Sequence, residues 1–331
     1  MTRVLVTGAG GFIGHHLVSY LKRRGDWVRG VDVARPQYAH TDADEFLEID
    51  LRDEPNARKA ASGVDHVYAL AADMGGMGYI SSHHARILHD NALIDLNTLE
   101  AARAAGVSRY LYTSSACVYP EFKQTDAAVT PLKEEDAYPA QPQDAYGWEK
   151  LISERLCAHY REDYAIETRI ARFHNILGPL GTWRGGREKA PAAICRKVAT
   201  AKLTGAAEID IWGDGEQTRS FCYIDDCVDG MTRLMASSCR DPLNIGQDRL
   251  ISINQLADMV CLIAGVALAK RHVPGPQGVR GRNSDNSRLR QVLGWEPQIS
   301  LEDGLTRTYA WIEAEVVRDL GAVANSYSGF T

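Results

Sequence analysis

The sequence predicts an α/β protein built on a doubly wound parallel sheet, with a smaller α/β region toward the C-terminus. Three observations favour this fold class. Short apolar segments alternate with helical patterns early in the chain, which is typical of strand–helix–strand units. A glycine-rich loop joins the first apolar segment to the first helical pattern. Beyond residue 170 the composition shifts toward loop-forming residues, which indicates a separate and smaller region.

The first strand is predicted at residues 4–6, and it runs directly into a loop that contains Gly8, Gly11 and Gly14. Apolar residues then recur at helical spacing until Gly25, where the helix should end. This order gathers backbone N–H groups and a helix N-terminus at one point, which suits a pyrophosphate. The spacing is GxxGxxG rather than the standard GxGxxG, and the alternative is a structural loop. The unbroken order of strand, loop, helix and strand favours a Rossmann-type nucleotide site.

A second strand at residues 27–31 ends at Asp32, whose carboxylate can accept hydrogen bonds from both ribose hydroxyls of NAD. The same carboxylate would repel the 2′-phosphate of NADP, but Arg35 lies close by and leaves NADP open as an alternative. Apolar segments at residues 45–51 and 64–72 predict two more strands, and the second of them should be central.

The loop at residues 73–78 follows a predicted strand and contains three glycines. Ligands of open α/β sheets bind at the carboxyl ends of strands, so this loop is a candidate ligand contact. The alternative is a plain flexible connection. His83, His84 and His89 follow without a cysteine or carboxylate at ligand spacing, so we interpret them as helix-surface residues and expect no metal site.

Tyr146 and Lys150 lie four residues apart in a segment with helical spacing of apolar residues, so they should share one helix face. A free phenol titrates near pH ~10 and is a poor base at neutral pH. A lysine ammonium one turn away favours the phenolate, so we expect it to lower the pKa of the phenol. Such a pair can move a proton on and off an alcohol while a hydride leaves the same carbon. The spacing alone is a weak signal, because an ordinary surface helix can carry it by chance.

The bulk composition argues against several classes of protein. A net charge of −6 disfavours a dedicated nucleic-acid binder. The sequence has no run of about 18 apolar residues, which disfavours a membrane span. The strand pattern begins at Arg3, which leaves no room for a signal peptide. The seven cysteines lack CxxC spacing and fit free thiols rather than disulfides or a zinc site, so we expect a cytoplasmic protein.

Two serines, Ser114 and Ser115, close a predicted strand ahead of Tyr146 and Lys150. Together with the glycine loop and Asp32, this order resembles the extended short-chain dehydrogenase/reductase family, in its nucleotide-sugar-modifying branch. Within that branch the chain is similar to the GDP-mannose 3,5-epimerases. The blocks that carry this similarity are residues 71–78, 114–123, 142–147, 172–175, 185–193, 212–221 and 278–286.

The resemblance implies an isomerase that keeps its NAD, oxidises C4 of GDP-D-mannose, exchanges protons at C5 and C3, and reduces C4 again. GDP-L-galactose is the expected product, and inversion at C5 alone would give GDP-L-gulose. In this family Ser115 holds the sugar alcohol, and Cys117 and Lys189 match the two groups that exchange protons. We expect a nearby cation to lower the pKa of Cys117, and burial or cations such as Arg187 to lower that of Lys189. Without the resemblance, Cys117 would be interpreted as a small buried apolar residue and Lys189 as a solvated loop lysine.

The resemblance also implies two sets of contacts, with no metal. The expected cofactor contacts are Gly8, Gly11, Phe12, Ile13, Gly14, Asp32, Asp50, Leu51, Leu70, Ala71, Ala72, Tyr146 and Lys150. The expected substrate contacts are Gly75, Ser115, Ala116, Cys117, Asn175, Glu188, Lys189, Ala190, Lys197, Gln217, Arg219 and Arg282.

Domain boundaries follow from the change in composition and the resemblance. We expect an NAD-binding Rossmann domain at residues 1–175 plus 221–246, and a nucleotide-sugar-binding domain at residues 176–220 and 247–316. Residues 317–331 carry small and polar side chains, and we expect this tail to be disordered.

Two other readings of the function stay open. The first is a different epimerase or dehydratase reaction on the same scaffold, and the second is a catalytically silent NAD-sensing regulator. Residues 116–117 are alanine and cysteine where 4,6-dehydratases carry acidic residues, and the intact Tyr146 and Lys150 disfavour a silent protein. Helices matching residues 91–105 and 144–161 pair as a four-helix bundle in homodimers of the family, so a homodimer is expected.

Overall fold

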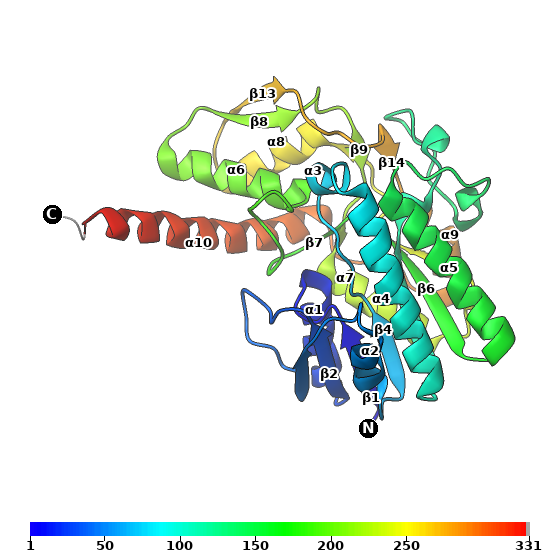
Figure 1. The fold of residues 1–331 in the computed structure, drawn as a ribbon. Helices are drawn as coiled ribbons and strands as arrows, with labels where there is room; N and C mark the ends of the chain where they lie inside the picture. The colour runs from blue at the N-terminus through cyan, green and yellow to red at the C-terminus, as the bar shows by residue number, and fades with distance from the viewer. Residues whose placement is uncertain (329–331) are drawn as a thin grey trace.

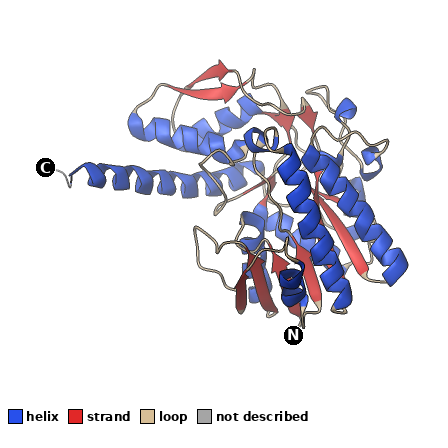
Figure 2. Cartoon of the chain, viewed as in Figure 1, coloured by secondary structure: helices blue, strands red, loops and turns tan. Residues whose placement is uncertain are grey.

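The computed structural model describes residues 1–328, with side chains described as far as residue 321. Seven parallel strands form one sheet in the order β11-β6-β5-β4-β1-β2-β3 (Figures 1 and 2). The strands are β1 (Arg3–Thr7), β2 (Trp27–Asp32), β3 (Glu45–Glu48), β4 (His66–Ala69), β5 (Arg109–Ser115), β6 (Glu167–Phe173) and β11 (Leu243–Ile245). The prediction of a doubly wound parallel sheet is confirmed.

The sheet separates two layers of helices, and β1 illustrates why. Its side chains alternate between the two faces, so Val4 and Val6 pack in one core while Leu5 packs in the other. Burial on both faces explains the continuous apolar runs of the central strands. The first face is covered by α1 (Phe12–Arg23) and α7 (Ile224–Ala236). The second face is covered by α2 (Glu54–Ala61), α4 (His84–Ala104) and α5 (Ala145–Tyr164) (Figure 1).

The order of strand addition reverses between β1 and β4, so their carboxyl ends form a topological switch point. The glycine loop follows β1 at this point, and residues 70–78 follow β4. The short helix α3 (Met77–Ile80) belongs to the segment after β4. Ligands of such sheets bind in the crevice outside the carboxyl ends of the strands, so this edge is where a site is expected.

A smaller region lies over that edge, at the top of Figure 1. The remaining strands form small sheets: β8 (Glu208–Trp212) with β13 (Ala269–Val273), β9 (Thr218–Arg219) with β12 (Ile251–Ser252) and β14 (Gly281–Arg282), and β7 (Ile176–Leu177) with β10 (Cys222–Tyr223). The remaining helices are α6 (Ala190–Thr204), α8 (Ile253–Ala264), α9 (Ser287–Leu293) and α10 (Leu301–Ser328). Helices α6, α8 and α10 pack together and continue the first core, so the two regions share one apolar interior.

Two helix boundaries differ from the expectations. The helix expected at residues 91–105 begins earlier, at His84. The tail expected to be disordered from residue 317 instead continues α10 through Ser328, because buried Leu305, Tyr309 and Ile312 anchor that helix at helical spacing. Residues 329–331 of the expected tail lie outside the described residues. None of the described helices is long and apolar enough to cross a bilayer.

Candidate active site

A cavity of about 990 Å³ lies between the carboxyl edge of the sheet and the smaller region. Every residue expected to contact cofactor or substrate lines this cavity. On the sheet side these are Gly8, Gly11, Phe12, Ile13, Gly14, Asp32, Asp50, Leu51, Leu70, Ala71, Ala72, Gly75, Ser115, Ala116, Cys117, Tyr146 and Lys150. Toward the smaller region they are Asn175, Glu188, Lys189, Ala190, Lys197, Gln217, Arg219 and Arg282.

The glycine loop is packed so closely that side chains do not fit. A Cβ at Gly14 would lie 2.1 Å from the carbonyl oxygen of Gly8, and one at Gly10 would lie 2.0 Å from that of Ala34. Gly8 itself has φ +69, which glycine adopts without strain. Helix α1 starts here with no side-chain cap and no acidic residue in its first turn, so its N-terminal N–H groups face the cavity unblocked. This cradle fits the pyrophosphate of a dinucleotide.

Asp32 ends β2 and its carboxylate is held by the backbone. Oδ2 accepts the Gly10 N–H at 2.9 Å and Oδ1 accepts the Val33 N–H at 2.7 Å. Burial raises the pKa of Asp32, while these backbone donors oppose that rise. Arg35, which left NADP open, lies 3.7 Å from the carboxylate of Glu48. The position of Asp32 suits the ribose hydroxyls of NAD.

Tyr146 and Lys150 lie in the first two turns of α5, as the spacing predicts. The Asp144 side chain caps this helix by accepting the Gly147 N–H at 2.8 Å. The Lys150 amine lies 5.6 Å from the centre of the Tyr146 ring. The expected lowering effect of Lys150 is present, but it does not decide the pKa of the phenol in the free protein. Burial raises the pKa of Tyr146, and the charge of Lys150 opposes this without overcoming it.

A buried acidic network behind this pair was not predicted. The Tyr112 hydroxyl lies 2.8 Å from Asp95 Oδ2 and 3.1 Å from Glu149 Oε1. Burial raises the pKa of Glu149 well above that of an ordinary carboxyl. Burial alone would lower the pKa of Lys150, but the neighbouring acidic groups of Glu149 and Asp95 raise it, so the amine stays charged. The sequence signal was the position of Glu149 three residues after Tyr146, on the same helix face.

Cys117 and Lys189 enter the cavity from different elements. Cys117 follows β5 in a short 3₁₀ turn, where its N–H donates to the Ser115 hydroxyl at 3.2 Å. Arg282 donates to the Cys117 sulfur at 3.2 Å, so the expected nearby cation is present. Lys189 is the N-cap residue of α6 and lies open to the cavity. The surrounding cavity wall desolvates the Lys189 amine and lowers its pKa, with Cys117 acting in the opposite direction.

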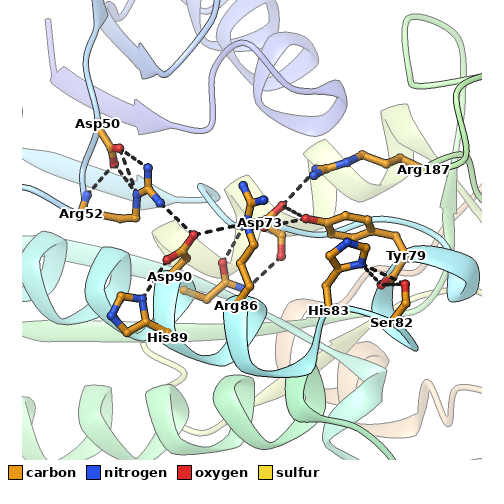
Figure 3. A network of polar contacts seen from close by, with 11 residues as sticks. Asp50, Arg52, Asp73, Tyr79, Ser82, His83, Arg86, His89, Asp90 and Arg187 are labelled. Carbon is orange, nitrogen blue, oxygen red and sulfur yellow. Dashed lines mark hydrogen bonds and ion pairs between the residues drawn. The ribbon is translucent and has the colours of Figure 1, made fainter.

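The expected influence of Arg187 on Lys189 is wrong. Arg187 instead donates to Asp73 Oδ1 at 3.0 Å, and its guanidinium lies 3.8 Å from the centre of the Tyr79 ring (Figure 3). Desolvation by the cavity wall, rather than the charge of Arg187, is the main cause of the lowered pKa of Lys189. Asp73 was missed as a site residue because its partner follows 114 residues later, beyond any local pattern.

Cations without carboxylate partners line the side of the cavity formed by the smaller region. Arg219 donates to the carbonyls of Thr218 and Val279, at 2.7 and 2.8 Å. Burial, aided by the charge of Arg282, lowers the pKa of Arg219 to about 9. Within residues 1–321, no carboxylate forms an ion pair with Arg219 or Arg282. Two desolvated cations side by side favour an anionic ligand, such as the diphosphate of a nucleotide sugar.

The fold and the site together define a class of protein. The NAD dependent epimerase/dehydratase family matches residues 4–246, and the chain belongs to this family. NAD is its cofactor, and the glycine cradle and Asp32 fit that dinucleotide.

Particular relatives extend the comparison, and they confirm the resemblance to GDP-mannose 3,5-epimerases. The chain is 51% identical over 319 residues to the GDP-mannose 3,5-epimerase of Arabidopsis thaliana, covering 96% of this chain and 84% of the relative. It is 51% identical over 323 residues to GDP-mannose 3,5-epimerase 1 of Oryza sativa subsp. japonica, covering 96% and 83%. It is 30% identical over 327 residues to UDP-glucuronic acid decarboxylase 1 of Xenopus tropicalis, covering 95% and 73%.

Solved structures share the fold over nearly the whole chain. A UDP-glucose 4-epimerase from Thermotoga maritima, solved with UDP-glucose, superposes with a TM-score of 0.83 at 26% identity, covering 95% of this chain and 99% of that one. A UDP-glucuronic acid 4-epimerase from Bacillus cereus, in complex with UDP-glucuronic acid and NAD, gives a TM-score of 0.79 at 27% identity, with the same coverage. Both are nucleotide-sugar epimerases by name, which agrees with the class that the site defines.

Proposed function

We propose that the protein is a GDP-mannose 3,5-epimerase, which converts GDP-D-mannose to GDP-L-galactose or, by inversion at C5 alone, to GDP-L-gulose. The observation that carries this proposal is the presence of Cys117 and Lys189 in the cavity that also contains Tyr146 and Lys150. A dehydrogenase needs only the last two, whereas inversion needs separate groups to remove and return a proton. The names of the two plant relatives support the same substrate.

The Tyr–Lys pair serves the oxidation and the reduction at C4. When bound, NAD accepts a hydride from the sugar and later returns it. Tyr146 exchanges a proton with the C4 hydroxyl, which Ser115 holds beside the phenol. Oxidation uses the phenolate form as the base, and the phenol that results returns the same proton when the carbonyl is reduced. Lys150 stabilises the phenolate that accepts this proton during oxidation and that forms again on reduction.

Cys117 and Lys189 serve the inversion. A carbonyl at C4 makes the hydrogens at C3 and C5 acidic, and the two residues remove and return these protons on opposite faces of the sugar. The lowered pKa of Lys189 increases its neutral, proton-accepting fraction near neutral pH. Arg282 donates to the Cys117 sulfur at 3.2 Å and so helps to fix the position of this side chain in the cavity.

The remaining residues of the cavity bind the two ligands in this proposal. The glycine loop and Asp32 hold NAD, in a domain of residues 1–175 plus 221–246. Residues 176–220 and 247–316 form the sugar-binding domain. The diphosphate and sugar contacts in that domain are Glu188, Ala190, Lys197, Gln217, Arg219 and Arg282, and Asn175 adds a contact from the NAD-binding domain.

Incubation of the pure protein with GDP-mannose in heavy water tests the function. The expected result is deuterium at C3 and C5 of the recovered nucleotide sugar. Deuterium only at other positions would indicate another epimerase or a dehydratase, and no incorporation would indicate a silent NAD-binding protein. A Tyr146→Phe variant is the matched control, because without the phenol the C4 carbonyl that acidifies these positions does not form.

We also propose that the protein works as a cytoplasmic homodimer. Helices α4 and α5 pack side by side, and they expose the large apolar residues Leu88, Leu96, Trp148 and Ile152. Burying these in a four-helix bundle with a second copy would remove them from water. All seven cysteines are free, which fits a reducing compartment. Sedimentation showing a monomer at micromolar concentration would refute the dimer.

A further inference from the structure

Lys189 ends an irregular segment in which the Glu188 carboxylate accepts the Gly186 N–H at 2.7 Å and pairs with Arg196 of α6 at 2.9 Å. Residues 185–189 have no regular structure before α6 begins at Ala190. Gly185 and Gly186 have φ of +92 and +87, a region that favours glycine, so the chain enters this segment through two conformationally permissive residues. A lysine side chain adds a flexible four-carbon stem. A precise position for the Lys189 amine therefore requires contacts from elsewhere in the fold.

Those contacts come from the loop after β4. Arg187 donates to Asp73 Oδ1 at 3.0 Å and stacks over the Tyr79 ring, and the Tyr79 hydroxyl donates to Asp73 Oδ2 at 2.8 Å (Figure 3). The backbones also meet, because the Gly76 N–H donates to the Arg187 carbonyl at 2.9 Å. A Cβ at Gly76 would lie 2.4 Å from the carbonyl oxygen of Glu188. The segment just before Lys189 is thus docked on residues 73–79 by side chains and backbone together.

Asp73 is also connected, through Asn91, to the helix that carries Tyr146 and Lys150. Its N–H donates to Asn91 Oδ1 at 2.6 Å, and the Asn91 amide donates back to the Asp73 carbonyl at 3.2 Å. The same amide lies 3.3 Å from Glu149 Oε2, next to Lys150 in α5. A continuous line of contacts therefore joins the helix that carries Tyr146 to the segment that carries Lys189.

We propose that Asp73 and Arg187 are positioning residues that fix the place of the Lys189 amine relative to Tyr146 and Cys117. The inference rests on the proposed role of Lys189 in proton exchange. Neither residue needs to touch the sugar, because both act through the placement of the Lys189 amine. Small displacements of a reacting group cost rate steeply, by up to about 100-fold for 1 Å. Arg187 is 44% exposed, and ion pairs at such sites contribute little to global stability, so its loss should affect the reaction rather than the fold.

The test compares Arg187→Met and the near-isosteric Asp73→Asn with Arg184→Met. Arg184 lies in the same stretch of chain, but it pairs with Asp319 of α10 and does not line the cavity. Deuterium incorporation at C3 and C5 and kcat should fall about 10- to 100-fold in the first two variants. NAD content, thermal midpoint and the transient reduction of NAD on adding GDP-mannose should stay unchanged. Arg184→Met should behave as wild type in every measurement.

A double variant separates this inference from the proposed function. If Arg187 acts through Lys189, Arg187→Met should add no further loss to a Lys189→Met background. A multiplicative loss in the double variant, or full exchange in both single variants at Asp73 and Arg187, would overturn the positioning role alone. Full exchange in Lys189→Met would remove Lys189 from the reaction and overturn both proposals. A fall in NAD reduction equal to the fall in exchange would indicate general distortion and would also overturn the positioning role.

Discussion

The cofactor side and the substrate side of the cavity are built in different ways. On the cofactor side, Gly8 to Asp32 supply a cradle of backbone N–H groups from one strand–loop–helix–strand unit. On the substrate side, Cys117 and Arg282 touch across 165 residues of sequence, and the chemistry is carried by side chains. A backbone-built site has no room for change at its glycines, whereas a side-chain-built site can be altered one function at a time. Substitutions on the two sides should therefore fail in different ways.

The largest effect is expected on the substrate side, from Cys117→Ala. Removing a proton-exchanging group should lower epimerisation about 10²- to 10⁴-fold, while NAD remains bound because the cofactor cradle is untouched. Cys261→Ala is the matched control, since that half-buried thiol lies on α8 outside the cavity. The measurement is turnover of GDP-mannose together with the NAD content of the purified protein. Full activity in Cys117→Ala would remove this residue from the mechanism.

The next largest effect is expected on the cofactor side, from Gly14→Ala. The added Cβ would lie 2.1 Å from the Gly8 carbonyl oxygen, so the loop must move, at a cost of about 3 kcal/mol. We expect loss of NAD from the purified protein and a lower free energy of unfolding, measured by urea denaturation. Gly321→Ala is the control, because nothing lies within 4 Å of its Cβ position. NAD retained at wild-type level in Gly14→Ala would contradict a backbone-built cofactor site.

The same contrast explains what the sequence could predict. Strand, glycine loop, helix and Asp32 form a local pattern, so the sheet, the glycine loop and Asp32 were predicted from the residues alone. The other cofactor contacts, such as residues 50–51 and 70–72, came from the resemblance. The pair of Tyr146 and Lys150 could also be predicted, because the two residues lie one helical turn apart. The roles of Cys117 and Lys189 came only from the resemblance, since no spacing rule links segments that meet through the tertiary fold.

The wrong predictions share one physical cause, because each depends on contacts that form only in the folded protein. The pKa of Tyr146 was expected to fall because a neighbouring lysine is visible in the sequence, whereas the burial that raises it depends on the whole fold. Arg187 was expected, as an alternative to burial, to lower the pKa of Lys189, but it contacts Asp73 instead and desolvation is the main cause. The prediction of a disordered tail from residue 317 was wrong, because buried contacts earlier in α10 allow this helix to continue past residue 317.

An effect of intermediate size is expected from Arg219→Ala. This variant should weaken substrate binding without removing a group that takes part in proton exchange. Hydrogen bonds to a charged group contribute about 1.5–3 kcal/mol, so the KM for GDP-mannose should rise about 10- to 100-fold. The Kd for NAD should stay constant, because Arg219 belongs to the smaller region. Arg280→Ala is the control, since Arg280 pairs with Asp214 and does not line the cavity. Equal changes in KM and in the Kd for NAD would contradict the assignment to the substrate side.

The smallest effect is expected at His174, which directly follows β6. We call this buried position, between the cofactor side and the substrate side of the cavity, the joint. His174 is fully buried, and Nε2 lies 3.0 Å from Asn244 Oδ1. Burial lowers the pKa of His174 to about 3, with the nearby charges of Arg282 and Arg172 acting in the same direction. An unfolded histidine titrates near pH ~6.5, so below that pH the unfolded chain binds a proton that the native state does not. Native stability is therefore lost as the pH falls from 6.5 toward 3.

Between pH 6.5 and 5.5 this proton should lower the free energy of unfolding by about 1 kcal/mol. Urea denaturation at both pH values measures the loss, and His174→Gln should reduce it by that amount relative to wild type. The control is His40→Gln, at an exposed loop position between β2 and β3, which should leave the loss unchanged. If His174→Gln keeps the full pH dependence, His174 takes up its proton in the native state as well. The joint would then be open to water, and the two sides of the cavity would be less firmly connected than the buried His174–Asn244 contact implies.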